Sequence, residues 1–369
     1  MINVTLPALP NLEEVIQDLQ QIWDTRILSN SGPFHQRFEM ALSEYLQVPH
    51  IVLFTNATTA LMCAQSVFPR QGEVITTPFT FAATAEAIIW AGNTPVFADI
   101  DPRTNNLCPK RVVEKITSET VAIMPVHCYG EPCDVKQFEE ISTQYNLPVI
   151  YDACHAFGVR DAGGSILRYG DVSVVSLHAT KVMNTFEGAV AICSNRTIKD
   201  KLDRLRNFGF VSEIEVDECG LNGKMTEFSA VVGYHQLACI EHHIEMRKAV
   251  DSLYRELLAN TSGVTVQPFS EELRHNGCYM PLLLRDEETR DQVKARLLDI
   301  DVNARRYFYP LVPDYRAFAG LSDTASRDFK NATSVSKRVL CVPIYPDLCE
   351  DTVIKICSNI RSTLAAAQR

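Results

Sequence analysis

Short apolar runs alternate with helical patterns over the first 210 residues of the chain. The apolar runs predict strands at 51–54, 73–76, 94–97, 121–126, 148–151, 172–177 and 189–193. Helical patterns at 58–67 and 82–89, and a helix beginning at Asp134 with a capping box to Gln137, lie between these runs. Strands that alternate with helices in this way form βα units. We therefore predict an α/β fold with a mostly parallel central sheet flanked by helices.

An amphipathic helix is predicted before the first of these strands, at residues 11–23, with Pro10 at its entry. Its predicted apolar face consists of Leu12, Val15, Ile16, Leu19 and Trp23. We expect this face to pack on the body of the protein.

The pattern changes after residue 226. A long helix is predicted at 226–258, and it is followed by a strand at 279–284, a helix at 287–298, a strand near 339–344 and a helix at 351–366. A chain of 369 residues exceeds the size at which one hydrophobic core stops growing. We expect a large N-terminal domain over residues 1–250 and a smaller C-terminal α+β domain over residues 251–369.

Charge and cysteine usage restrict the classes of function. The 35 Lys and Arg residues against 45 Asp and Glu residues give a net charge of −10, which argues against a nucleic-acid partner. No uncharged apolar stretch reaches the length of a membrane-spanning helix, and the first residues do not form a basic segment followed by an apolar one, so we expect a cytoplasmic protein. The 12 cysteines are scattered without any C-x-x-C pair, which indicates reduced thiols and no metal site.

Polar side chains follow several of the predicted strands, where α/β sheets bind their ligands. Thr58 opens a helix after one strand, and it is either part of a phosphate site or an ordinary helix cap. Asp152 and His155 follow another strand and form either a functional pair or a buried structural one. Ser176 and Lys181 leave a third strand, where a solvated lysine is the simpler interpretation.

Taken together, these groups match the requirements of one cofactor. Pyridoxal phosphate needs a lysine for a Schiff base, an acid beside its pyridine nitrogen, a phosphate cradle and a flat apolar face. Lys181 and Asp152 supply the first two groups, Thr58 and Ser176 supply the cradle, and Phe81 supplies the face.

The chain resembles the DegT/DnrJ/EryC1/StrS family of nucleotide-sugar aminotransferases, which are pyridoxal-phosphate enzymes of fold type I. The resemblance covers most of the chain and rests on an ordered set of segments. These segments are 32–34, 56–58, 77–84, 95–101, 125–130, 152–158, 176–181, 220–225 and 307–310.

The resemblance implies a role for each matching residue. Lys181 bonds to the cofactor and moves protons, Asp152 pairs with the pyridine nitrogen, and His155 lies near the ring oxygen. The other cofactor contacts that it implies are Ala57, Thr58, Phe81, Ser176 and Asn222. In the family, the residue that matches Asn222 reaches the cofactor phosphate of the neighbouring subunit, which implies a homodimer with shared active sites.

The resemblance also implies the reaction. L-glutamate donates an amino group to a nucleotide-linked keto sugar for O-antigen or other glycan biosynthesis. Several segments look most like the branch that acts at C4 of dTDP-4-keto-6-deoxy-D-glucose. Alternatives are a C3-aminotransferase, an enzyme for UDP- or GDP-linked sugars, and a non-catalytic regulator with the same fold. Arg26 and Tyr309 are candidate substrate contacts.

Overall fold

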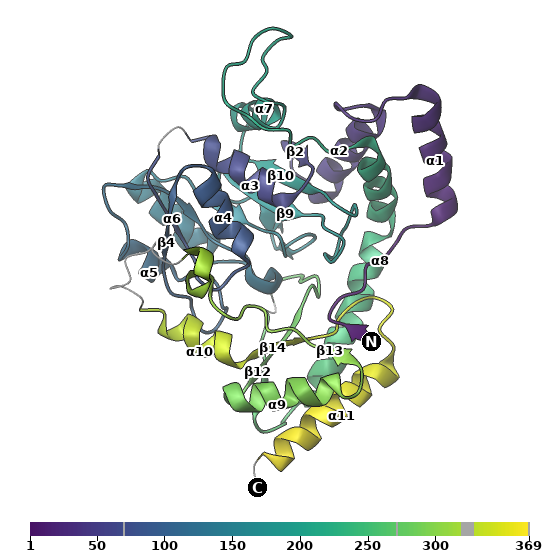
Figure 1. The fold of residues 1–369 in the computed structure, drawn as a ribbon, viewed down its shortest axis with the longest axis vertical. Helices are drawn as coiled ribbons and strands as arrows, with labels where there is room; N and C mark the ends of the chain where they lie inside the picture. The colour runs from purple at the N-terminus through teal and green to yellow at the C-terminus, as the bar shows by residue number, and fades with distance from the viewer. Residues whose placement is uncertain (69–70, 271, 319–327, 368–369) are drawn as a thin grey trace.

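The structure is a computed structural model that describes residues 1–68, 71–270, 272–318 and 328–367. Seven strands of the described chain form its central sheet (Figure 1). They are β2 (Ile51–Phe54), β3 (Glu73–Thr76), β4 (Thr94–Phe97), β5 (Thr120–Met124), β6 (Ile150–Asp152), β9 (Val172–Ser176) and β10 (Ala189–Cys193). The order is β4-β3-β5-β6-β9-β10-β2, with single bridges from Ile123 to Val149 and from Val126 to Asp152 joining β5 to β6.

The strands of this sheet are parallel except for one. β4, β3, β5, β6 and β9 run in the same direction, whereas β10 is antiparallel to both β9 and β2. The prediction of a mostly parallel sheet is therefore confirmed. Most positions in these strands are buried, which requires that helices cover both faces of the sheet.

The helices around the sheet are α2 (Pro33–Leu46), α3 (Ala57–Ser66), α4 (Ala82–Trp90), α5 (Pro109–Val113), α6 (Val135–Tyr145) and α7 (Arg196–Leu205). Several of these helices begin at a residue whose side chain caps them. Asn56 caps α3, Asn195 caps α7, and Asp134 accepts a hydrogen bond from the backbone N–H of Gln137 to cap α6. The helix start expected at Asp134 is confirmed, but the capping box is not reciprocal, because the Gln137 side-chain amide donates to the Asp134 carboxylate instead of accepting from the backbone N–H of Asp134.

Helix α1 (Leu12–Thr25) forms as predicted, but its buried face differs from the one predicted. Val15 and Ile22 are buried, whereas Leu12, Ile16 and Trp23 are 68%, 53% and 68% exposed. The reason is that α1 contacts the rest of the chain mainly through the single helix α8 (Glu227–Leu258), which covers only a narrow stripe. Leu12, Ile16 and Trp23 lie outside that stripe, and the described residues leave them largely exposed.

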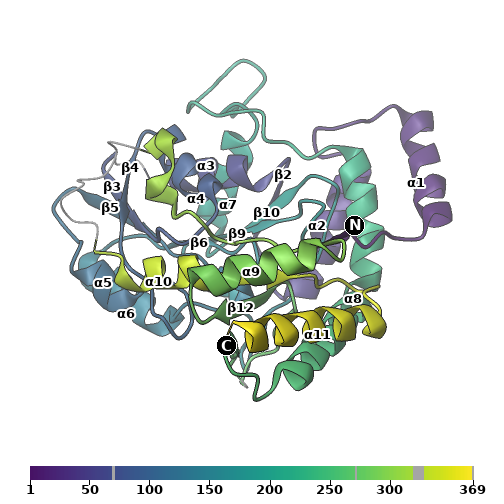
Figure 2. The same cartoon turned by 60° about the horizontal axis from the view of Figure 1, so that its bottom comes forward.

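The C-terminal third forms a second, smaller layer. Strands β11 (Val264–Val266), β12 (Met280–Leu284) and β14 (Val339–Val342) make an antiparallel sheet. Three helices pack near it, namely α9 (Glu287–Leu298), α10 (Lys330–Arg338) and α11 (Glu350–Ala366), and Figure 2 shows α9 and α11 side by side. The C-terminal half of α8 contributes Val250, Tyr254 and Leu258 to the same apolar core. This packing supports a domain division near residue 250, which we retain as a proposal.

The first strand of the chain belongs to neither of these sheets. β1 (Ile2–Asn3) pairs in parallel with β13 (Val302–Asn303). The side-chain amide of Asn303 also donates a 3.2 Å hydrogen bond to Asn3. The N-terminus is thereby attached to the C-terminal third of the protein.

Candidate active site

A cavity of about 650 Å³ opens at the carboxyl ends of β6 and β9. Seven residues expected at a cofactor site line it: Ala57, Thr58, Phe81, Asp152, His155, Ser176 and Lys181. β6 and β9 are neighbouring parallel strands, so the residues that follow them meet at one edge of the sheet. The fold thus brings together groups that are more than 100 residues apart in the sequence.

Asp152 contributes a buried carboxylate to this cavity. Its side chain is 5% exposed, and Oδ2 accepts a 2.7 Å hydrogen bond from the Thr84 hydroxyl. Oδ1 accepts a weaker bond of 3.2 Å from the backbone N–H of Cys154. No cation among the described residues forms an ion pair with Asp152, although a buried carboxylate ordinarily requires a positive or donating partner.

Lys181 contributes a primary amine to the same cavity. The residue lies in the loop after β9, where its backbone N–H donates to the carbonyl of His178 at 2.9 Å. The side chain is half-buried, and its Nζ lies 5.8 Å from the centre of the Tyr279 ring. No other described residue forms a hydrogen bond or ion pair with this amine, which leaves it available for chemistry.

His155 presents a hydrogen-bond donor to the cavity. Burial, with a smaller contribution from the charge of Lys181, holds the pKa of its imidazole well below the usual value, so the ring is neutral. Nδ1 accepts a 3.2 Å hydrogen bond from the backbone N–H of Tyr129. The single ring proton therefore resides on Nε2, and His155 offers an N–H rather than a lone pair to a bound group.

The first turn of α3 and the end of β9 form a cradle for an anion. Asn56 caps the backbone N–H of Thr59 at 2.9 Å, whereas the backbone N–H groups of Ala57 and Thr58 have no partner among the described residues. Ser176 is buried at the last position of β9, beside these groups in the cavity wall. Free N–H groups at a helix N-terminus are suited to a phosphate.

The cavity also has an aromatic wall. Phe81 immediately precedes α4, and 62% of its surface is exposed, which is unusual for so large an apolar side chain. Tyr279, Tyr307 and Phe308 line the cavity as well. One cavity thus contains an amine and a buried carboxylate that form no ion pair with the described residues, together with an anion cradle and an exposed ring. This set of groups fits pyridoxal phosphate.

Three other candidate residues lie outside this cavity. Arg26 is exposed at the C-terminal cap of α1 and is not brought to the cavity within this chain. Tyr309 lines an adjacent hollow instead, where Arg290 and Arg306 lie over its ring. Asn222 is exposed and does not line the cavity of its own protomer.

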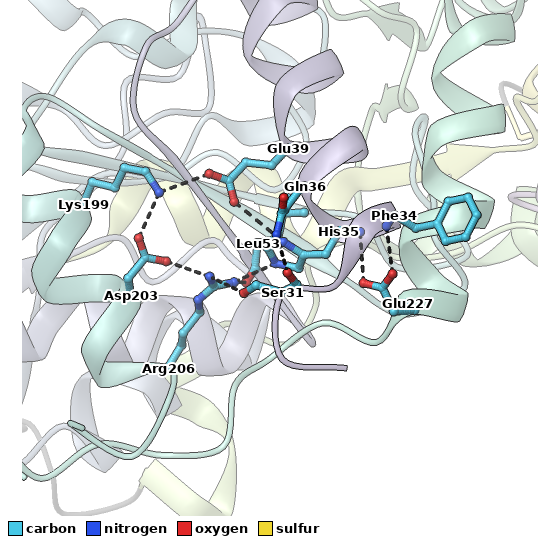
Figure 3. A network of polar contacts seen from close by, with 10 residues as sticks. All are labelled: Ser31, Phe34, His35, Gln36, Glu39, Leu53, Lys199, Asp203, Arg206 and Glu227. Carbon is cyan, nitrogen blue, oxygen red and sulfur yellow. Dashed lines mark hydrogen bonds and ion pairs between the residues drawn. The ribbon is translucent and has the colours of Figure 1, made fainter. Parts of the chain in front are cut away.

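A buried polar network fixes both ends of the segment that carries Asn222 (Figure 3). At one end, Arg206 donates to the carbonyl of Leu53 at 2.7 Å and to Nε2 of His35 at 2.8 Å. At the other end, the Glu227 carboxylate accepts from the backbone N–H groups of Phe34 at 2.8 Å and His35 at 3.0 Å, which caps α2. The segment 207–226 therefore projects from an anchored base.

Sequence reasoning missed several residues of the cavity. Thr80 lines the cavity and Thr84 donates to Asp152, and both lie in the segment 77–84, from which only Phe81 was predicted as a contact. Tyr307 and Phe308 line the cavity as well, and they lie in the segment 307–310, from which only Tyr309 was predicted. Their presence in those segments was a usable signal. Tyr279 had no such signal, because it reaches the cavity only through the packing of the C-terminal layer.

Comparison with known proteins agrees with this geometry. The profile of the DegT/DnrJ/EryC1/StrS aminotransferase family matches residues 11–361. Two curated relatives carry the name dTDP-4-amino-4,6-dideoxy-D-glucose transaminase. The one from Shigella dysenteriae is 45% identical over 98% of both chains, and the one from Escherichia coli is 44% identical over 96% of both.

Solved structures support the same assignment. A structure of DesI in the presence of its TDP-sugar product has a TM-score of 0.94 and 31% identity, and the match covers 100% of this chain and 94% of that one. NtdA from Bacillus subtilis with bound cofactor PMP has a TM-score of 0.87 and 25% identity, with 95% and 82% of the two chains covered. The chain therefore belongs to the DegT/DnrJ/EryC1/StrS family of aminotransferases, which are pyridoxal-phosphate-dependent enzymes of fold type I.

Proposed function

We propose that the protein transfers an amino group from L-glutamate to C4 of dTDP-4-keto-6-deoxy-D-glucose, giving dTDP-4-amino-4,6-dideoxy-D-glucose. The observation that carries the transferase activity is the placement of the unpaired Lys181 amine and the buried Asp152 carboxylate in one cavity. The sugar is suggested by the two relatives of that name, which match this chain at 45% and 44% identity over nearly their whole length.

Each residue of the cavity has a distinct task in this proposal. When bound, pyridoxal phosphate supplies the electron sink and the amino-group carrier. Asp152 holds a proton at the pyridine nitrogen, and Thr84 orients the carboxylate that does so. Lys181 takes and returns the proton that moves between the reacting carbons. The Nε2–H of His155 would donate a hydrogen bond to the ring oxygen, while the start of α3 and Ser176 would bind the phosphate.

The absorbance spectrum of the purified protein tests this assignment. The wild-type protein with pyridoxal phosphate is expected to show a visible band, which L-glutamate alone should convert to the ultraviolet band of the aminated cofactor. Lys181→Ala should lose the visible band and at least ~10³-fold in kcat. Lys330→Ala is the matched control, because that side chain is 86% exposed and outside the cavity. Retention of activity in Lys181→Ala would refute the proposal.

A panel of nucleotide keto sugars tests the substrate. A GDP-perosamine synthase from Vibrio cholerae is 32% identical over 98% of this chain, so a GDP-linked 4-keto sugar is the second candidate. Mass detection of the aminated products of dTDP-, UDP- and GDP-linked substrates separates the candidates, and 3-keto isomers test a C3-aminotransferase. A product from the GDP-linked sugar alone would replace dTDP in the proposal.

We further propose that the enzyme is a homodimer in which Asn222 completes the partner's site. Apolar side chains are exposed on two parts of one protomer. They are Leu12, Ile16 and Trp23 of α1, together with Phe208, Phe210, Ile214 and Val216 of the anchored segment. A second copy of this chain would cover them and place the exposed Asn222 against a cavity other than its own.

Complementation between inactive protomers tests the shared site. Lys181→Ala and Asn222→Ala homodimers are expected to be impaired. Each mixed dimer should contain one intact site and one doubly defective site, and it should therefore regain about half of the activity of a wild-type dimer. Sedimentation gives the oligomeric state of each sample. A dimer that shows no recovery after verified subunit exchange would place Asn222 in its own subunit's site.

The proposed product is a building block for O-antigen or other glycan assembly in the cytoplasm. No helix within the described ranges is both long and apolar enough to cross a bilayer. None of the 12 cysteines forms a disulfide. Fractionation of cells with an antibody against the protein checks the location.

A further inference from the structure

A second hollow adjoins the cofactor cavity. Its volume is about 350 Å³, and it shares Thr80, Phe81, Tyr307 and Phe308 with the cavity that holds Lys181. Its remaining walls come largely from the segment between α9 and α10. A molecule that occupies both spaces would have one end beside Lys181 and the other in this hollow.

The hollow is positively charged although the chain as a whole carries −10. Lys294, Arg305 and Arg306 line it, and no Asp or Glu is among the described residues that do so. The guanidinium of Arg305 and the amine of Lys294 form no ion pair with another described residue. Such a concentration of unpaired cations beside a reaction cavity is suited to an anionic part of a substrate.

The charges on the rim of the hollow do not cancel this excess. Asp291 lies 3.6 Å from Arg306, but it also pairs with Arg290 at 2.7 Å. Glu287 raises the pKa of the Tyr309 hydroxyl through a hydrogen bond, and it also pairs with Arg290 at 3.3 Å. Both carboxylates are thus shared with the buried Arg290, and neither forms an ion pair with Arg305 or Lys294.

Aromatic rings line the hollow beside these cations. Tyr307, Tyr309 and Tyr315 all contribute to its walls, and the Arg305 guanidinium lies 5.8 Å from the centre of the Tyr307 ring. Tyr315 is 40% exposed. Planar side chains next to arginines provide stacking surface for a nucleobase together with donors for phosphate oxygens.

We propose that this hollow binds the nucleoside diphosphate part of the substrate, with Arg305 and Lys294 as the principal contacts to the diphosphate. The sugar then extends past Tyr307 into the cavity, toward Lys181. This inference rests on the proposed function, because it takes a nucleotide-linked sugar as the substrate. It also gives the acidic chain a local means of holding a doubly charged ligand.

Equilibrium binding of dTDP by titration calorimetry, without turnover, tests the inference. Arg305→Ala and Lys294→Ala are each expected to raise the Kd for dTDP about tenfold, and Arg305→Glu should raise it further. Arg305→Lys should restore part of the affinity. Thymidine should bind weakly and equally to all variants, and the affinity of the wild-type protein for dTDP should fall with added salt.

The matched control is Arg103→Ala, because that side chain is 84% exposed, pairs with Asp101 and lies outside the hollow. The control should bind dTDP as the wild-type protein does. Thermal unfolding of each variant establishes that it is folded before binding is compared. In steady-state assays, Arg305→Ala should raise the KM for the nucleotide sugar more than it lowers kcat.

Several results would overturn the inference. One is unchanged dTDP affinity in folded Arg305→Ala and Lys294→Ala, and another is equal affinity of the wild-type protein for thymidine and dTDP. A third is an Arg305→Glu variant that loses the spectral response to L-glutamate but retains dTDP binding, because the hollow would then serve the amino donor. Failure of the proposed function is a separate outcome, recognised when the wild-type protein aminates none of the nucleotide keto sugars.

Discussion

The hydroxyl of Thr84 donates a 2.7 Å hydrogen bond to Oδ2 of Asp152, and it lies 2.8 Å from the hydroxyl of Thr80. Because the carboxylate only accepts, Thr84 must donate to it and accept from Thr80. The two hydroxyls therefore form a directed chain that ends on Asp152. This chain fixes which face of the carboxylate is available to the cofactor.

Thr84→Val is expected to impair this arrangement without emptying the space. The variant should lower kcat/KM by about ten- to a hundredfold, because one bond to a charged group contributes ~1.5–3 kcal/mol. It should also shift the pH titration of the cofactor absorbance, which a purely structural effect would leave in place. Thr84→Ser should retain both properties, and Thr25→Val on the exposed α1 should change neither. If the cofactor absorbance of Thr84→Val titrates with pH as that of the wild-type protein does, Thr84 does not orient the Asp152 carboxylate.

Phe81→Ala is expected to weaken cofactor binding with little effect on folding. Phe81 is 62% exposed, so its removal leaves no core cavity, but it removes the flat face on which a ring would stack. The cofactor Kd should rise about tenfold in equilibrium dialysis, while the melting temperature of the cofactor-free protein should stay within about 2 °C. Trp90→Ala is the control at the other end of α4, since Trp90 is 75% exposed and outside the cavity. Equal loss of cofactor in both variants would argue against stacking.

Acid is expected to destabilise the fold through His35. Burial, assisted by the charges of Arg206 and Lys199, lowers the pKa of His35 from 6.5 to about 3. The unfolded chain therefore binds a proton between pH 6.5 and about 3 that the folded chain does not. The contribution of His35 is fully present above pH 6.5 and falls by about 1.4 kcal/mol per pH unit below it.

Urea unfolding of His35→Gln between pH 7.5 and 5 checks this expectation. The variant should be less stable than the wild-type protein at pH 7.5, because the glutamine oxygen does not reproduce the position of the Nε2 that accepts from Arg206. Its stability should decline less steeply toward pH 5. His242→Gln is the exposed control. If the unfolding free energies of the wild-type protein and His35→Gln change equally with pH, His35 is not held neutral in the folded state.

Glu131 is expected to have the opposite pH dependence. Its side chain is 7% exposed, its Oε2 has no partner among the described residues, and burial raises its pKa from 4.5 to about 7. The folded state therefore retains a proton between about pH 4.5 and 7 that the unfolded chain loses. Stability from this group is present below pH 4.5 and is lost as the pH rises to about 7.

Glu131→Gln should accordingly be more stable than the wild-type protein at pH 8, by at most about 3 kcal/mol, and should have no such advantage at pH 4.5. Urea unfolding at the two pH values measures the difference. Glu140→Gln on the exposed side of α6 is the control. A Glu131→Gln variant that is destabilised equally at both pH values would point to a specific hydrogen-bonding role for the carboxylate.

The sequence predicted those parts of the fold that depend on local pattern. The strand at 73–76 and the helix at 287–298 have the predicted bounds, because each is a short apolar run or a capped helical pattern. The buried face of α1 was predicted wrongly, because it depends on α8, which lies more than 200 residues later. Periodicity identifies an apolar face but not the surface that covers it.

The same distinction applies to the cavity. Asp152 and Lys181 follow strands, so their meeting could be expected from the rule that parallel strands end at one edge. Tyr279 and the basic residues at 294–306 reach the site through the C-terminal layer. Their position depends on tertiary packing, for which the sequence carries no local pattern.

The pairing of β1 with β13 has a consequence for synthesis of the protein on the ribosome. Ile2 pairs with Val302, and the carbonyl of Val4 accepts a 3.1 Å hydrogen bond from the backbone N–H of Ile344. Translation proceeds at about 5–20 residues per second, so the first strand waits on the order of 15–60 s before its partner exists. During that interval the N-terminal segment is available to chaperones, and the enzyme can complete its fold only when translation is nearly finished.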